Sequence, residues 1–138
     1  MLDNLLVAVD HSDVSRRVLA AAQDLALLSS GKVWVLHLRE KEAMPRGRFM
    51  PTESDLEAKS MVEDAARALA KTGVKAHAEV RNTIFGYAAK EIVAAARDHD
   101  AGVIIMGSRG RGDVAGLALG STAHKVIHLT DRPVLVVR

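Results

Sequence analysis

Short apolar runs alternate with segments of helical periodicity along the chain. Four of the runs are continuous and too short for helices, which is typical of parallel strands that are buried on both faces of a sheet. These runs are residues 5–9, 33–38, 103–106 and 134–137. Residues 74–80 instead alternate apolar and polar side chains, which predicts an edge strand with one wet face.

Apolar residues at every third or fourth position predict four helices between these strands. The helices are expected over residues 14–28, 54–69, 86–98 and 121–129. Ser54 and Glu57 have the spacing of a capping box at the start of the second helix. The alternating order predicts an α/β fold: a single domain over residues 1–138, with a doubly wound, five-stranded parallel sheet and helices on both faces. In such a sheet the ligand site lies beyond the carboxyl ends of the strands.

Two stretches break this alternation. Residues 40–52 carry Pro45, Gly47 and Pro51 without any period, and we expect them to form a mobile loop. Residues 107–120 contain five glycines and connect a buried strand to a helix. Because glycine lets a ligand approach the backbone without a Cβ in the way, this glycine-rich connection is a candidate ligand-binding loop.

The glycine-rich connection has the chemistry of a phosphate site. The N–H groups of Gly120, Ser121 and Thr122 stand at the start of a helix, where unpaired donors and the helix dipole favour an anion. Two hydroxyls add donors there, and Arg109 and Arg111 could screen a polyphosphate. A plain flexible surface loop is the alternative interpretation of the same glycines.

Three familiar motifs are excluded by spacing. The chain has no Gly-Lys-Ser/Thr sequence, and the turn after the first strand, residues 9–13, lacks the glycines of a dinucleotide-binding fingerprint. Met106 stands two residues before Ser108, which excludes a Gly-x-Ser-x-Gly nucleophile elbow. Asp10 ends the first strand, and two interpretations of it stay open. Its carboxylate would bind a ribose or help place a divalent ion, or it would cap the first helix.

The composition narrows the classes of function. The 138 residues are 49% hydrophobic and 26% charged, as in ordinary globular proteins. A net charge of +2 is too small to indicate a nucleic-acid or membrane surface, and we expect no membrane span or signal peptide. The chain has no cysteine, which excludes disulfides and suits a cytoplasmic protein. We interpret His37 as a packed histidine, and His124 and His128, four residues apart, as part of a solvated face.

Gly107 and Gly110, followed nine residues later by Gly120, Ser121 and Thr122, form a longer pattern. This pattern resembles the G-2x-G-9x-G-(S/T) signature of the ATP-binding subgroup of the universal stress protein family. The strand ends at residues 7–10 and 35–38 and the closing strand at residues 133–137 resemble the same family, so the likeness covers nearly the whole chain.

The resemblance implies the strand order 3-2-1-4-5 and binding of ATP with Mg²⁺ or Mn²⁺. It implies an adenine pocket near Ala8, Val9 and Leu38. The residues that would flank the nucleoside are Asp10, Met106 and Gly107. Those that would hold the phosphates are Gly110, Gly120, Ser121 and Thr122. Such proteins commonly form homodimers through the last strand, which here is the apolar edge segment Val134, Leu135, Val136 and Val137.

Two positions depart from the family pattern. His11 stands beside the expected nucleotide, where relatives often have a small residue, and we expect it to narrow the mouth of the site. Gly102 stands where relatives often have Asp, at the end of a strand remote from the site, so we expect only a local effect.

The sequence therefore predicts an ATP-binding stress-response protein that acts as a nucleotide-dependent switch or regulator. We expect slow or no ATP hydrolysis, because the sequence identifies no base that would activate water. Two alternatives stay open: an ATP-consuming α/β hydrolase or ligase, and a dimeric interaction module that binds no nucleotide.

Overall fold

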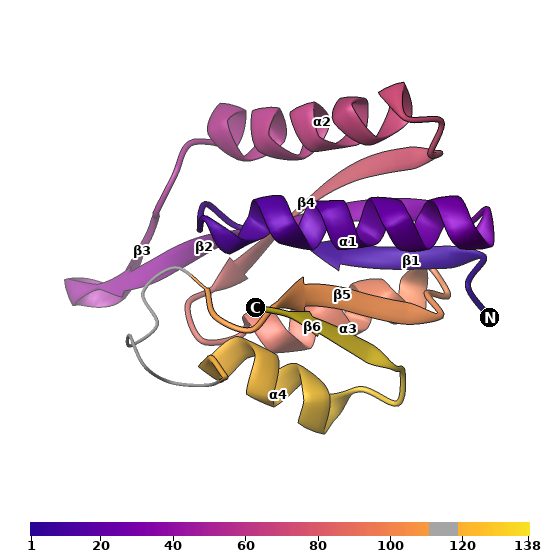
Figure 1. Cartoon of the computed structure of the whole chain (residues 1–138). Helices are drawn as coiled ribbons and strands as arrows, with labels where there is room; N and C mark the ends of the chain where they lie inside the picture. The colour runs from indigo at the N-terminus through magenta and orange to yellow at the C-terminus, as the bar shows by residue number, and fades with distance from the viewer. Residues whose placement is uncertain (111–118) are drawn as a thin grey trace.

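The computed structural model of the chain describes residues 1–110 and 119–138 (Figure 1). The strands of the described residues are β1 (Asn4–Ala8), β2 (Lys32–Met44), β3 (Arg48–Pro51), β4 (Ala76–Ile84), β5 (Val103–Gly107) and β6 (Val134–Val137). The helices are α1 (Val14–Ser29), α2 (Asp55–Lys71), α3 (Ala88–Asp98) and α4 (Ser121–Leu129), with a short 3₁₀ turn η1 (Pro45–Gly47).

Five of the strands form a parallel sheet. β2 pairs with β1 and β4, and β5 pairs with β1 and β6, all in parallel. The spatial order of these five strands is therefore β4-β2-β1-β5-β6, which is the predicted order 3-2-1-4-5 when β3 is left out of the count. The predicted α/β fold with a doubly wound sheet is confirmed.

The prediction of a mobile loop over residues 40–52 was wrong, and the sheet has a sixth strand. β2 runs on to Met44, η1 turns the chain, and β3 returns antiparallel to β2. Lys41 pairs with Pro51 of β3 and with Ile84 of β4, so the two strands lie on opposite edges of β2. Backbone pairing explains why this exposed, irregular sequence is extended. The N–H and C=O groups on both edges of β2 find partners in β3 and β4, although few of the side chains are buried.

Helices cover both faces of the sheet (Figure 1). Leu5 and Val7 of β1 belong to the core cluster that contains buried residues of α1 and α2. Leu6 belongs to the cluster that contains buried residues of α3 and α4. Because side chains alternate along a strand, Val35 and His37 of β2 face the first layer, whereas Leu38 packs against the second.

Caps and close contacts fix the ends of the elements. Ser54 is the N-cap of α2, and its hydroxyl accepts a hydrogen bond of 3.1 Å from the Glu57 N–H, which is one of the two bonds of the predicted capping box. α3 begins at Ala88, two residues later than predicted, because Gly86 has a left-handed φ of +94°. A Cβ added to Gly102 would collide with the Met1 carbonyl oxygen, so the N-terminal residues pack where a side chain would otherwise stand. Among the described residues, none of the helices has the length and apolar character needed to cross a bilayer.

Candidate functional site

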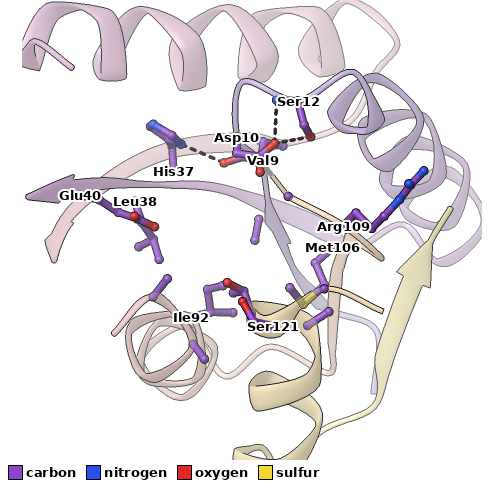
Figure 2. A pocket seen from close by; sticks show the side chains of 18 of the residues that line it. Val9, Asp10, Ser12, His37, Leu38, Glu40, Ile92, Met106, Arg109 and Ser121 are labelled. Carbon is purple, nitrogen blue, oxygen red and sulfur yellow. Dashed lines mark hydrogen bonds between the residues drawn. The ribbon is translucent and has the colours of Figure 1, made fainter. Parts of the chain in front are cut away.

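A pocket of about 460 Å³ opens at the carboxyl edge of the parallel strands. This volume is typical of sites for small ligands. Figure 2 shows Met106 and Ser121 on one side of the pocket and Leu38 and Glu40 across from them. The pocket is lined by eleven of the residues that the sequence singled out for the site: Ala8, Val9, Asp10, Leu38, Met106, Gly107, Arg109, Gly110, Gly120, Ser121 and Thr122.

Asp10 is held in the turn between β1 and α1. Its Oδ1 accepts hydrogen bonds from the Ser12 N–H at 2.8 Å and from the Ser15 hydroxyl at 3.1 Å, and it also accepts from the Ser12 hydroxyl. The N-cap position of α1 belongs to Asp13, whose side chain makes no capping hydrogen bond. Asp10 therefore braces the turn that precedes the helix, instead of capping it, and its carboxylate is fixed at the pocket wall (Figure 2).

The connection from β5 to α4 is tied at both described ends. The Ser108 N–H donates to the Val137 carbonyl at 2.7 Å, and the Gly120 N–H donates to the Ser108 carbonyl at 2.5 Å. A Cβ on Gly107 would lie 3.0 Å from the Arg109 carbonyl oxygen and from the Val14 side chain, so glycine suits this close approach. Both ends of the glycine-rich connection therefore lie beside the end of β5.

The start of α4 has no side-chain cap. Its N-cap residue is Gly120, which has no side chain, and the first turn contains no acidic residue. The backbone N–H groups of Ser121 and Thr122 and the positive end of the helix dipole therefore stand at the pocket, next to the two hydroxyls. This is the arrangement that binds phosphate at helix N-termini.

The cationic side chains near the start of α4 differ from the two arginines that the sequence analysis expected there. Arg109 lines the pocket, but its guanidinium points away from Ser121 in Figure 2. Lys125, one helical turn beyond Ser121, also lines the pocket and was missed by the sequence analysis. An amphipathic plot of α4 with Ser121 facing the site could have found it, because residues four apart share a helix face. Arg111 lies outside the described residues.

The rest of the pocket lining contains apolar and acidic side chains. Ile92 of α3 extends the apolar surface formed by Ala8, Leu38 and Met106. Glu40 of β2 lines the pocket beside Leu38, two residues further along the same strand (Figure 2). Burial raises the pKa of Glu40 above its ordinary value, nearby carboxylates raise it further, and His37 partly offsets them.

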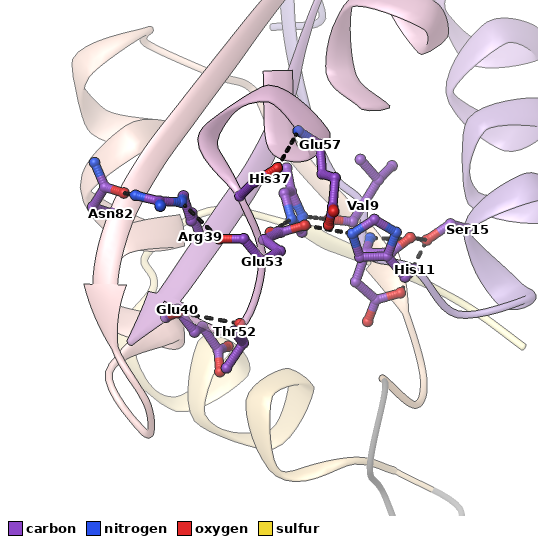
Figure 3. A network of polar contacts seen from close by, with 12 residues as sticks. Val9, His11, Ser15, His37, Arg39, Glu40, Thr52, Glu53, Glu57 and Asn82 are labelled. Atoms are coloured by element: carbon purple, nitrogen blue, oxygen red, sulfur yellow. Dashed lines mark hydrogen bonds and ion pairs between the residues drawn. The ribbon is translucent and has the colours of Figure 1, made fainter. Parts of the chain in front are cut away.

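His11, His37 and Glu53 form a polar cluster that the sequence analysis did not assemble (Figure 3). Glu53 contacts both rings: its Oε2 lies 2.5 Å from His11 Nε2, and its Oε1 contacts His37 Nε2. Burial alone would raise the pKa of Glu53, but hydrogen bonds to the two histidines, together with their charges, lower the pKa overall. His37 is buried, as expected, but it is packed against a carboxylate and not against apolar groups alone.

The whole chain, residues 1–138, matches the model of the universal stress protein family. The chain belongs to the universal stress protein family. Universal stress protein YxiE of Bacillus subtilis is 31% identical to it over 151 aligned residues that span 100% of both proteins. A universal stress protein of Thermus aquaticus is 34% identical, again over 100% of both chains. A solved structure of the universal stress protein from Archaeoglobus fulgidus in complex with dAMP is 28% identical, with a TM-score of 0.75 and full coverage of both chains.

In this universal stress protein, the pocket combines three chemical surfaces. The start of α4 presents N–H groups and hydroxyls. The sheet face that packs against α3 and α4 presents apolar groups, and β2 presents carboxylates. Such a pocket suits an elongated ligand with an anionic end, an apolar plane and hydroxyl groups.

Proposed function

We propose that this universal stress protein binds ATP together with Mg²⁺ or Mn²⁺ and acts as a nucleotide-dependent switch or regulator in a stress response. The observation that carries the proposal is the uncapped start of α4, which meets the carboxyl ends of β1 and β5 in one pocket. The dAMP complex of the relative from Archaeoglobus fulgidus supports an adenine nucleotide as the ligand.

The surfaces of the pocket suggest how ATP would lie. The base would lie against the apolar wall of Ala8, Leu38 and Met106. The ribose would lie near Asp10, whose carboxylate can accept hydrogen bonds from its hydroxyls. The groups assigned to the phosphates are those of Gly110, Gly120, Ser121 and Thr122.

The distribution of charge supports this orientation. Lys125 lines the pocket beside the start of α4, so the anionic tail has a cation near it. Asp10, Glu40 and Glu42 line the other part, where a triphosphate would be repelled. A carboxylate at the boundary is also the oxygen ligand that Mg²⁺ prefers, so Asp10 fits a metal ion carried by the nucleotide.

We assign residues 1–138 to one nucleotide-binding domain with slow or no ATP turnover. N–H groups and hydroxyls stabilise the charge of bound phosphates but do not take a proton from an attacking water. Binding would change the surface that a downstream protein meets at the mouth of the pocket. A cytoplasmic location is part of the proposal and suits a chain without cysteine.

A homodimer through β6 is the second part of the proposal. β6 ends the sheet order and pairs with β5 along one edge. Leu135 in its centre is 40% exposed, which is unusual for the apolar strand of a parallel sheet. A second copy of the chain would cover this edge and prevent uncontrolled strand pairing.

Calorimetry with ATP and Mg²⁺ tests the nucleotide site. We expect saturable binding of one ATP per chain, and no heat at millimolar nucleotide would contradict the proposal. Native mass spectrometry of the purified protein gives an independent check, because a co-purified nucleotide separates this function from that of an interaction module. Rapid release of AMP and pyrophosphate would instead favour a ligase or hydrolase.

A further inference from the structure

Three side chains from separate parts of the chain meet on the face of the sheet opposite to Leu38. His11 follows β1, His37 belongs to β2, and Glu53 directly precedes the N-cap of α2 (Figure 3). One ligand atom from each lies within 4.8 Å of the other two. The side chains of His37 and Glu53 are 6% exposed, and that of His11 is 36% exposed.

A backbone contact fixes the tautomer of His37. Its Nδ1 lies 2.9 Å from the carbonyl oxygen of Val9, which can only accept a hydrogen bond, so Nδ1 carries the hydrogen. In the neutral ring, Nε2 then presents its lone pair to Glu53. A carbonyl on the second ring nitrogen is also the outer contact that orients metal-binding histidines in other proteins.

The contact between His37 and Glu53 therefore places a lone pair against a carboxylate oxygen, and a positive charge has to lie between them. A proton on Nε2 of His37 would also meet this requirement, and the neutral ring of His11 can donate a hydrogen bond to Glu53 from its own Nε2. One divalent ion satisfies the carboxylate and both neutral rings at once.

We propose that His11, His37 and Glu53 bind one divalent transition-metal ion, for which zinc is the best match. Two imidazoles and one carboxylate form a known ligand set for zinc, and three protein ligands leave a fourth position for water or another ligand. Tetrahedral zinc holds its ligand atoms about 3.3 Å apart, so Glu53 withdraws slightly from both rings on binding. The carboxylate of Asp10, which lines the same pocket, adds a field that favours a cation.

The ion would join three elements that meet at the rim of the pocket. It would tie the turn after β1 to β2 and to the chain that enters α2 beyond the β2–β3 hairpin. Because the ligands are brought together only in the folded protein, binding stabilises the native state by mass action. The site needs no nucleotide, so it is independent of the function proposed above.

Zinc titration of the metal-stripped, nucleotide-free full chain tests this proposal by calorimetry. We expect one ion per chain and a higher midpoint of thermal unfolding with zinc than without it. The variants H11N and E53Q each remove one ligand, and we expect each to weaken binding by more than about 100-fold, beyond the range typical of outer-shell contacts. H11N is the safer variant for folding, because the His11 side chain is partly exposed.

The double variant H124N/H128N is the matched control. These two histidines lie on α4 with ring centroids 4.7 Å apart and are the other histidine pair with chelating spacing. We expect the control to bind zinc as the natural chain does. Absence of binding by the natural chain overturns the proposal, and so does binding that H124N/H128N removes and H11N retains. Failure of ATP calorimetry leaves this result unaffected, because no nucleotide is present.

Discussion

Ser121 begins α4 at the phosphate end of the proposed site. If its hydroxyl donates to a charged phosphate oxygen, removal of that donor costs about 1.5–3 kcal/mol. We therefore expect S121A to weaken ATP binding by roughly 10–100-fold, measured by calorimetry with Mg²⁺. S60A makes the same chemical change on an exposed position of α2 and should bind ATP as the natural chain does. An unchanged affinity in S121A would show that the phosphates lie elsewhere.

Glu40 gives a pH-dependent prediction at the same pocket. Burial raises its pKa above the ordinary value of 4.5, with further contributions from Asp10, Glu42 and Glu53 and an opposing one from His37. A raised pKa in the folded state means that folding favours the protonated carboxyl. The folded state is therefore penalised as the pH rises through the raised pKa, and the penalty is absent below the ordinary value.

The variant E40Q removes this ionisation. We expect it to be more stable than the natural chain near about pH 8 and to lose that advantage near about pH 4. Urea unfolding followed by the fluorescence of Trp34, the single tryptophan, measures the difference. E63Q, on an exposed position of α2, is the control and should shift stability by less than about 0.5 kcal/mol at either pH. A constant advantage of E40Q at both pH values would contradict the stated sign.

At the level of the elements, α2 depends on its cap. The Ser54 hydroxyl accepts the Glu57 N–H at 3.1 Å, which satisfies one of the open donors of the first turn. We expect S54A to lower the free energy of unfolding by about 1 kcal/mol, measured by urea unfolding. S60A again provides the control, because alanine in the middle of an exposed helix face removes no cap. Equal stabilities of S54A and S60A would refute the cap.

The parallel sheet could be predicted because burial leaves a pattern in the sequence. Strands that are buried on both faces give continuous apolar runs. The predicted bounds of α4 and β6 agree with the observed ones. The β2–β3 hairpin could not be predicted in this way. Its residues, from Lys41 to Pro51, are mostly exposed, and their order comes from backbone pairing, which any side chain permits.

The phosphate end of the pocket could be predicted from the sequence, whereas the cluster of His11, His37 and Glu53 could not. The phosphate end is contiguous in sequence around Gly120 and Ser121, so a motif could reveal it. Glu53 is 42 residues from His11 and reaches it only because the hairpin brings the start of α2 to the carboxyl edge. Without the hairpin, nothing local in the sequence connects Glu53 with His37. The clue that was available is that His11 follows the first predicted strand and His37 lies at the end of the adjacent one, residues 33–38, so both lie near one edge of the sheet.

At the scale of the whole molecule, the proposed homodimer depends on the apolar edge strand β6, in which Leu135 is exposed. If a second copy covers Leu135, burial of the part of this side chain that is exposed, 40% in each protomer, contributes about 1–2 kcal/mol to association. We expect L135K to raise the dimer dissociation constant by at least roughly 10-fold, measured by sedimentation velocity over a range of concentrations.

The control for the assembly is L28K. Leu28 is 86% exposed near the end of α1, so this variant makes the same change from leucine to lysine at a position away from β6. Its dimer constant should equal that of the natural chain, because the new charge meets no partner. If L28K and L135K dissociate alike, a general effect of added positive charge explains both, and the contact lies elsewhere. If the natural chain stays monomeric at the highest concentration, Leu135 is exposed for another reason, and the edge of β6 has to be protected by its short length of four residues.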